Sequence, residues 1–269
     1  MLSRQLFVVC GVAFATVAQA DWLTISPVII EIATASKPVA VRVTNDSDRE
    51  ATFQLDTSAW QQLNGKDVYA ASEDLILAPS ILVIPPRKSQ TFRVLLRDGR
   101  PSPVERTYRV IVEDITEASK QTDPISTTTV SFKFTHNLPV LVAPSGKIVN
   151  ALRWQACATG ATGRNRLSSA PDPSMKATNT ANNLPAVLPD AETCVRLLNS
   201  GNRRIKVLSL TLAGDGWQQS LALKAGENVL VGAEREWRIP LLPGQLNAVR
   251  GVLVETAESG TLAAEAGGF

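Results

Sequence analysis

The sequence predicts an all-β protein made of antiparallel β-sandwiches. Short segments alternate β-branched or aromatic residues with polar ones, and clusters of Asn, Asp, Gly and Pro separate these segments along the chain. After residue 20, no stretch combines a sustained 3.6-residue apolar period with helix caps at both ends. Short strands at regular spacing with little helix are typical of packed antiparallel sheets.

The first twenty residues have the layout of a cleavable secretory signal peptide. Arg4 precedes an apolar run, 6–14, and small residues end at Ala20, after which we expect cleavage. The run is too short to span a bilayer, so we expect no stable membrane insertion. Cys10 follows Val9, where a lipoprotein signal would need a small residue, so no lipid anchor is implied.

Charge and cysteine content narrow the classes of function. A formal net charge of +2 over 269 residues gives no electrostatic case for nucleic acid or anionic membrane as the main partner. Cys157 and Cys194 remain after the signal peptide, and an even number in an exported chain favours a disulfide. With His136 as the one histidine and none of the common catalytic motifs, we expect no metal site, no cofactor and no enzyme activity.

The expected strands follow one another in both halves. In the first half they include 39–43, 92–96 and 108–112, with turn clusters at 45–48, 64–67, 85–88 and 98–101. In the second half we expect strands at 195–199, 205–212, 221–223, 228–231 and 249–256. The segments 41–49 and 195–203 share a strand, an Asn, a turn and an Arg in the same order. In each, the side chain of Asn45 or Asn199 is predicted to bond the backbone of the turn.

The pattern divides the chain into two sandwich domains. Pro144-Ser145-Gly146 interrupts the strands, so we expect an N-terminal domain over 21–144 and a C-terminal domain over 145–258. Residues 158–190 have almost no apolar anchor and predict a flexible insertion, whose base a Cys157–Cys194 bond would close. The tail 259–269 is also expected to be loose.

An apolar stripe precedes the domain boundary. Val130, Phe132 and Phe134 alternate with polar residues after a loop rich in Thr, Ser, Asp and Pro. On a strand the three side chains share one face. From the pattern alone, the stripe either fills the core of this protein or is meant for another chain.

A succession of short motifs in the first half carries a family resemblance. The motifs are Ile25-Ser26-Pro27-Val28, Val41-Arg42-Val43-Thr44-Asn45, Trp60, Asn64-Gly65, Leu77-Ala78-Pro79, Ile84-Pro85-Pro86, Gln90-Thr91-Phe92-Arg93-Val94, Glu105-Arg106-Thr107-Tyr108-Arg109-Val110 and Asn137-Leu138-Pro139-Val140. In this order they resemble the PapD-like periplasmic pilus assembly chaperones of the chaperone–usher pathway, over nearly all of residues 22–144. The Leu138-Pro139 ending is most similar to the archaic branch, and the second half is much less similar.

The resemblance implies a fold and a mechanism. It implies two immunoglobulin-like domains in an L-shaped arrangement, in the periplasm of a Gram-negative cell. Such a chaperone lends a strand to an incomplete pilin subunit and delivers the subunit to an outer-membrane usher. By position, Val130, Phe132 and Phe134 are the donor residues, and Thr128 is a weaker contact. Residues 122–129, before the stripe, would form a loop. The free protein is expected to protect this apolar edge by self-association.

The basic pair that anchors the subunit carboxylate in the best-known members looks absent. Ile29 and a position at Phe134 or Thr135 occupy the corresponding places. Arg109, Arg93 and Lys133 could substitute, because a buried carboxylate needs a charged partner. Arg109 is the first choice, with an ordinary solvated arginine as the alternative.

Two other functions compete with the chaperone. A secreted structural or adhesive β-protein, such as a fibre subunit, fits the weak similarity of the second half. A cell-envelope hydrolase would need carboxylates brought together in space, and the sequence gives no sign of such a pair.

Overall fold

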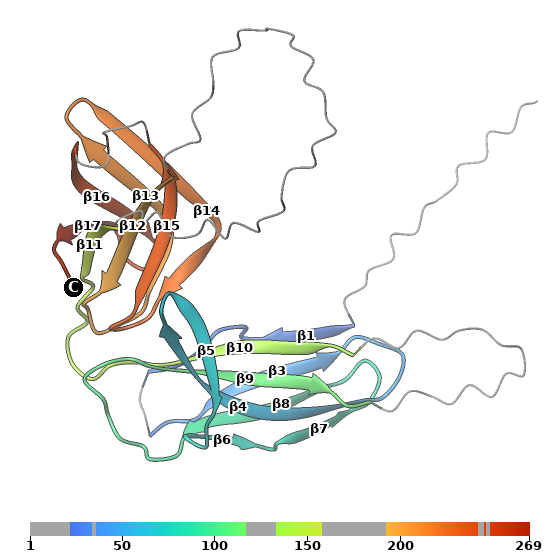
Figure 1. The fold of residues 1–269 in the computed structure, drawn as a ribbon. Coiled ribbons are helices and arrows are strands. Elements are labelled where there is room, and N and C mark those ends of the chain that lie inside the picture. The colour runs from blue at the N-terminus through green and yellow to red at the C-terminus, as the bar shows by residue number, and fades with distance from the viewer. Residues whose placement is uncertain (1–21, 34–35, 117–132, 158–191, 242–244, 246–247) are drawn as a thin grey trace, which may run out of the picture.

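The computed structural model describes residues 22–33, 36–116, 133–157, 192–241, 245 and 248–269. The expected signal peptide and the expected insertion at 158–190 lie outside these ranges. The described residues form two all-β domains that meet at an angle, with β1 to β10 in one domain and β11 to β17 in the other (Figure 1). No helix among the described residues is long and apolar enough to cross a membrane.

The N-terminal domain is a sandwich of two sheets. One sheet has four strands in the order β1 (Leu23–Ser26), β3 (Val39–Asn45), β8 (Ser89–Leu96) and β6 (Leu75–Ala78). The other has the order β2 (Ile30–Ile32), β10 (Thr135–Val142), β9 (Arg106–Asp114), β4 (Ala51–Leu63) and β5 (Lys66–Ala71), and β7 (Ile81–Ile84) also pairs with β4. The chain crosses between the two sheets after Ser26, so β1 and β2 lie on opposite layers.

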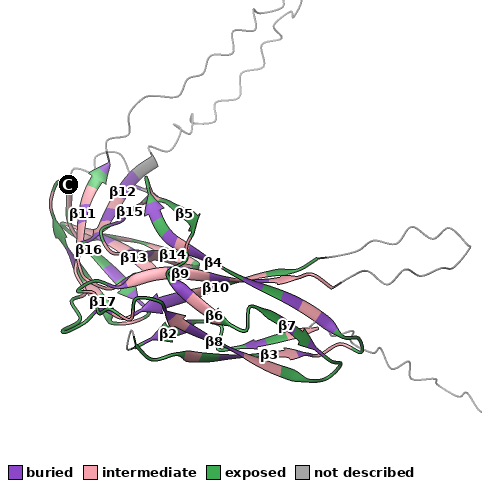
Figure 2. Cartoon of the chain, turned by 90° about the horizontal axis from the view of Figure 1, so that it is seen from below, coloured by how far each residue is buried: buried purple, intermediate pink, exposed green. Residues whose placement is uncertain are grey.

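Alternation along these strands produces the core. In β3, Val41 and Val43 are buried while Arg42 between them is exposed, as the two-residue period of a strand predicts. The inward residues of both sheets form one cluster, with Phe53 and Phe92 among its largest members. Figure 2 shows the same alternation of buried and exposed residues on β3 and β8.

The C-terminal domain is one seven-stranded sheet folded over a common core. Its order is β14 (Trp217–Val229), β13 (Ile205–Gly214), β16 (Val249–Thr256), β17 (Gly260–Ala266), β11 (Leu152–Cys157), β12 (Glu192–Asn199) and β15 (Glu234–Pro240). Buried residues from β13 and β16 share one cluster with residues from β11, β12 and β15, so the two halves of the sheet pack face to face. This domain is therefore also a sandwich.

The C-terminal tail was expected to be loose, and the structure shows that this prediction was wrong. Residues 259–269 are not loose, because β17 pairs antiparallel with β16 and parallel with β11. The tail has few large apolar residues, but Ala264 is buried in the core and the strand joins the two halves of the sheet. Its backbone hydrogen bonds, which composition does not reveal, hold it in place.

The expected strands at 221–223 and 228–231 are one strand. β14 runs from Trp217 to Val229, and its register against β13 shifts between Val207 and Ser209. Gly226 lies in this stretch with φ of 65°, which glycine adopts without strain. The prediction of two strands was wrong because a bulge interrupts the apolar alternation without ending the ladder.

Asn45 and Asn199 make equivalent turns in the two domains. Asn45 Nδ2 donates to the carbonyls of Arg49 (2.7 Å) and Ile84 (2.9 Å), and Asn45 Oδ1 accepts from Ser47 N (3.0 Å). Asn199 Nδ2 donates to Arg203 O (2.8 Å) and Val229 O (2.9 Å), and its Oδ1 accepts from Gly201 N (3.0 Å). Both side chains are fully buried. The predicted backbone bonding by both asparagines is confirmed.

Candidate functional site

β10 has a strand partner along one whole side but along only part of the other. All eight of its residues pair with β9, whereas only Val140, Leu141 and Val142 pair with β2. Within the described part of the chain, the segment 135–139 therefore has no partner on the side away from β9. We call this segment, together with Phe134, the open edge.

The open edge exposes backbone groups in strand register. Asp114 N at the end of β9 donates to Phe134 O at 3.0 Å, so Phe134 and Asp114 are a hydrogen-bonded pair of the ladder. Antiparallel pairs alternate between bonded and non-bonded, so the backbone groups of Thr135 and Asn137 point away from β9. Pro139 has no N–H and ends the row of donors. An added strand could pair with Thr135 and Asn137.

The side chains of the open edge alternate between the core face and the outer face. Leu138 and Val140 are buried in the N-terminal core, and Phe134 and His136 continue the same face toward the start of the strand. Phe134 is 45% exposed, so it lies at the rim of the core. His136 Nε2 is buried and has no hydrogen-bond partner. This face thus passes from core to surface within one strand.

Trp22 covers part of the rim. Its ring stacks on Phe53, with centroids 5.7 Å apart, and meets the Phe134 ring at 5.3 Å. Asp114 of β9 lies opposite Phe53 of β4 on one side and opposite Phe134, just before β10, on the other. Both phenylalanines therefore lie on the core face of the sheet. Phe134 packs on Trp22 but keeps nearly half of its surface exposed. Its position is therefore compatible with both alternatives, the core of this protein and the groove of a partner.

The predicted donor residues fall mostly outside the described ranges. Thr128, Val130 and Phe132 precede residue 133, so their role stays a prediction. Lys133 is exposed and directly precedes Phe134.

The three candidate anchors lie in different places. Arg109 is opposite Pro139 on β9, on the outer face of the sheet, and its guanidinium is 3.9 Å from the Trp60 ring centroid and 5.7 Å from that of Tyr69. Arg109 Nε and Trp60 Nε1 are both buried without a hydrogen-bond partner. Arg93 lies exposed on β8 in the other sheet, away from the open edge.

The surroundings of Arg109 favour it among the three. Trp60 is buried in a cluster with Leu141, Leu230 and Ala233, which joins the N-terminal to the C-terminal domain. Arg109 therefore presents its charge near the domain junction, at the end of the open edge. Ile29, Phe134 and Thr135, the residues that the sequence comparison set against the family's basic pair, are all exposed and uncharged.

The two domains are held together by polar contacts as well as by this cluster. Gln62 Nε2 donates to Asn228 O (2.8 Å), and Gln62 Oε1 accepts from Leu230 N (2.9 Å). Glu105 Oε1 accepts from Arg204 N at 2.9 Å. Burial raises the pKa of the Glu105 carboxyl, although the Arg204 N–H and the Arg203 and Arg204 charges oppose that rise.

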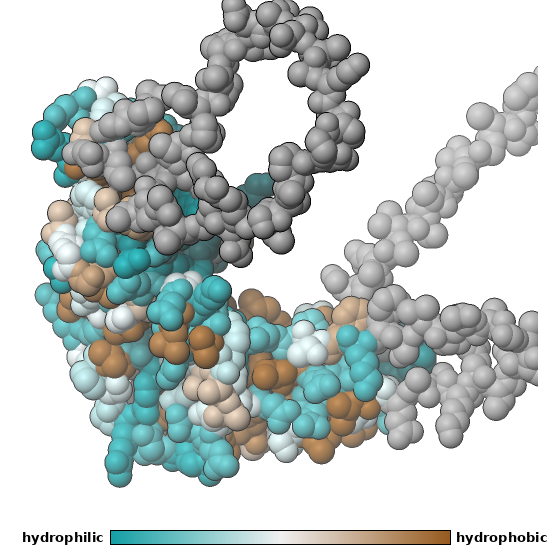
Figure 3. All heavy atoms as spheres, in the orientation of Figure 1, coloured by the Kyte–Doolittle hydropathy of each residue, from teal (hydrophilic) through white to brown (hydrophobic). Residues whose placement is uncertain are grey.

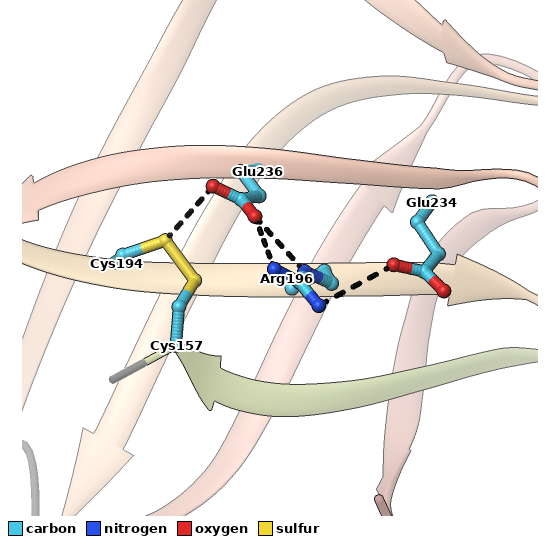
Figure 4. The surroundings of a disulfide bond; sticks show 5 residues. All are labelled: Cys157, Cys194, Arg196, Glu234 and Glu236. Carbon is cyan, nitrogen blue, oxygen red and sulfur yellow. Dashed lines mark hydrogen bonds and ion pairs between the residues drawn. A yellow bond between two sulfur atoms is a disulfide. The ribbon is translucent and has the colours of Figure 1, made fainter. Parts of the chain in front are cut away.

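The predicted disulfide is present and joins the ends of β11 and β12. Cys157 and Cys194 are paired in the strand register, and Glu236 Oε2 lies 3.5 Å from Cys194 Sγ (Figure 4). Glu236 also pairs with Arg196, which Figure 4 shows between Glu236 and Glu234. The cysteines and Glu236 could not hold a metal in this state, because both sulfurs are bonded to each other.

Sequence reasoning missed Trp22, Gln62 and Glu105. Each of the three contacts a residue that is distant in sequence: Trp22 contacts Phe134, Gln62 contacts Leu230 and Glu105 contacts Arg204. The position of Trp22 just before the first strand carried no signal of its own. A buried glutamate on a strand boundary reads from sequence as an ordinary surface charge.

Within its described residues, the chain is a two-domain β-sandwich protein in which β10 is open along part of one side and leads into the domain junction. Residues 22–147 match the model of the family described as pili and flagellar-assembly chaperone, PapD N-terminal domain. The N-terminal domain is therefore a domain of this family of pilus-assembly chaperones, which is not a class of enzymes. Pilus chaperones of this family are periplasmic.

Solved structures share the fold over both domains. A chain of the complex between the CsuC chaperone and the CsuE tip adhesion subunit, from archaic chaperone–usher pili of Acinetobacter baumannii, has a TM-score of 0.62 at 16% identity, covering 91% of this chain and 99% of that one. The E. coli chaperone DraB has a TM-score of 0.53 at 17% identity, with 91% and 96% covered.

A third structure is a complex of the Salmonella enterica SafA pilin with the SafB chaperone. It has a TM-score of 0.53 at 13% identity, covering 89% of this chain and 92% of that one. At these identities the likeness shows the two-domain immunoglobulin-like fold. No curated protein matches the chain in sequence.

Proposed function

We propose that this protein is a periplasmic chaperone that binds pilin-type subunits by donor-strand complementation and delivers them to an outer-membrane usher. The observation that carries the proposal is the open edge of β10, which directly continues the apolar stripe of Val130, Phe132 and Phe134 in a domain of the pilus-chaperone family. A signal peptide over residues 1–20 would bring the chain to the periplasm.

The physical basis is strand addition. A pilin subunit that lacks its last strand has an open groove and unpaired strand edges, and a lent strand supplies both the missing ladder and the apolar side chains. Thr135 and Asn137 would extend the ladder, while each stripe residue buried in the groove would contribute roughly 1.5 to 3 kcal/mol. Family membership favours this role over that of a fibre subunit.

The archaic branch of the pathway is the best candidate for the partner system. The Leu138-Pro139 ending of β10 resembles that branch, and the structure of an archaic chaperone complex shares the fold. Pro139 marks the place where the open edge gives way to pairing with β2. Strand addition would therefore stop at this residue.

Arg109 is the proposed anchor for the carboxylate of the subunit. The contact with Trp60, with the guanidinium carbon 3.9 Å from the ring centroid, would hold the guanidinium in place while its terminal nitrogens bind a carboxylate. Arg109→Ala should weaken subunit retention, and Arg109→Lys should recover only part of it, since lysine keeps the charge but lacks the planar fork. Equal retention by Arg109→Ala and wild type would show that the anchor lies elsewhere.

Co-purification from periplasm tests the proposal. The wild-type chain should retain the pilin encoded beside its gene, and the double variant Phe132→Asp with Phe134→Asp should lose it. The matched control is Ile81→Asp with Val83→Asp, which places the same charges on half-exposed apolar positions of β7. If the folded stripe variant retains the pilin at the wild-type level, donor-strand binding is wrong. Loss of folding in that variant alone would instead favour the own-core role.

A further inference from the structure

The side of the N-terminal domain that carries the open edge has a second unpaired strand edge. Among the described strands, β1 pairs with β3 only and ends the four-stranded sheet, while the first part of β10 lies open at the edge of the six-stranded sheet. Trp22 directly precedes β1, and Phe134 directly precedes β10. Their rings meet at 5.3 Å, so they bridge the two layers at the end of the sandwich.

Three rings form a row from the core to the surface. Phe53 is buried with 1% of its surface exposed, Trp22 stacks on it at an interplanar angle of 22°, and Phe134 leans on Trp22 at 49°. Trp22 is held at its backbone as well, because Trp22 O accepts from Asp46 N at 2.9 Å. The indole is therefore a fixed platform, supported on its inner side by the core.

Phe134 needs such a platform. It precedes Thr135, the first paired residue of β10, and among the described residues its backbone makes one hydrogen bond to β9, from Asp114 N to Phe134 O. A strand end with one hydrogen bond frays unless side-chain packing holds it. The contact with Trp22 supplies that packing, and it aligns the start of the open edge with the rest of β10.

We propose that Trp22 is a positioning residue for subunit binding. Trp22 holds Phe134 and the start of β10 in the extended form that an incoming subunit strand pairs with. The two rings together present an apolar surface at the open side of the sandwich, to be received by a pilin-type subunit. This inference rests on the proposed function, and it assigns to Trp22 a role in the rate of capture rather than in the fold.

The test compares variants of Trp22 in the full chain. Trp22→Ala removes the ring, Trp22→Leu keeps apolar volume without the ring, and Trp22→Phe restores an aromatic contact. Trp217→Ala is the control, because Trp217 packs on the core of the C-terminal domain, far along the sequence from the open edge. Urea unfolding measures the loss of stability in each variant, so that association rates can be compared between variants of equal stability.

Two measurements follow. Hydrogen exchange of residues 134–138 in the free chain reports the order of the strand start. The second is the association rate of the pilin that co-purifies with wild type, unfolded in urea and diluted into each variant. For Trp22→Ala and Trp22→Leu we expect faster exchange and association slower by about threefold to tenfold, the range that an aromatic pair contributes. Trp22→Phe should return most of the rate, and Trp217→Ala should capture at the wild-type rate.

The outcomes separate this inference from the proposed function. If Trp22→Leu and Trp22→Ala both associate with the pilin at the wild-type rate, the role of Trp22 is wrong. Capture of the pilin by the wild-type chain would still support the chaperone function. Equal slowing by Trp22→Leu and by Trp217→Ala at equal stability loss would also overturn it, because the effect would then be one of stability. If the wild-type chain captures no pilin, the proposed function falls and the inference falls with it.

Discussion

Glu105 in the N-terminal domain accepts a hydrogen bond from the backbone N–H of Arg204 in the C-terminal domain, at 2.9 Å. The other carboxylate oxygen lies 3.6 Å from Arg203 Nε, and Glu105 N donates to Asn202 O at 2.9 Å. The residue is almost completely buried. Through its side chain and its backbone N–H, this one residue links three consecutive residues of the other domain, and it helps to set the angle between the two sandwiches.

The first prediction concerns the acceptor on Glu105. Glu105→Ala should lower the free energy of unfolding by about 1 to 3 kcal/mol, because it leaves the buried Arg204 N–H without a partner. Glu105→Gln keeps an acceptor oxygen and should cost less than the alanine variant. Urea unfolding with fluorescence detection measures both. Equal losses in the two variants would show that the charge, not the acceptor, stabilises the junction.

The second prediction concerns pH. Burial raises the pKa of Glu105 in the folded protein, so the folded state binds this proton more tightly than the unfolded state. The stabilisation is complete below the unfolded pKa of glutamate, about 4.3, and is lost as the pH rises through the folded pKa. The wild type should therefore lose stability relative to Glu105→Gln as the pH rises from about 4 toward neutral. A constant difference across that range would contradict the raised pKa.

The third prediction concerns the paired asparagines. Asn45→Ala and Asn199→Ala should each lower the free energy of unfolding by about 1 to 3 kcal/mol, because each leaves buried backbone groups unsatisfied. Asn202→Ala is the control, because the hydrogen bond from the Asn202 side chain to Lys147 O lies at the exposed surface. Thermal unfolding compares the three variants. A loss in the control as large as in the buried pair would refute the assignment.

The fourth prediction concerns the disulfide. The Cys157–Cys194 bond closes a loop with a sequence separation of 37 residues. Its removal by Cys157→Ala with Cys194→Ala should destabilise the C-terminal domain by about 4 kcal/mol on the chain-entropy model. Unfolding of the wild type with and without a reductant should give the same loss. An unchanged midpoint under full reduction, verified by thiol labelling, would count against it.

The exposed surface of the N-terminal domain places the open edge in context. Figure 3 shows apolar side chains gathered in several patches on the visible face of this domain, between polar ones. Val28, Ile29, Ile81 and Val83 are all about half exposed or more. The open edge combines an unpaired backbone with the apolar stripe that directly precedes it in sequence, whereas apolar exposure alone is common on protein surfaces.

Much of the fold was predictable from the sequence because it depends on local alternation and turn chemistry. The strands 39–43, 92–96 and 108–112 lie within β3, β8 and β9, and the asparagine turns bond as their sequence context implies. The pairing of Cys157 with Cys194 followed from there being two cysteines in an exported chain. The tail was misjudged because its strand is held by partners on β16 and β11 rather than by apolar residues of its own.

The sequence by itself determined the strand pattern, the apolar stripe that ends at Phe134 and the motifs of the pilus-chaperone family. Only the tertiary structure decided where β10 loses its second partner, that Arg109 lies on Trp60 near the domain junction, and that Trp22 supports Phe134. The physical reason is the range of the interactions. Alternation and turns are written in neighbouring residues, whereas an open edge, a stacked arginine and a row of three rings exist only after strands far apart in sequence have paired.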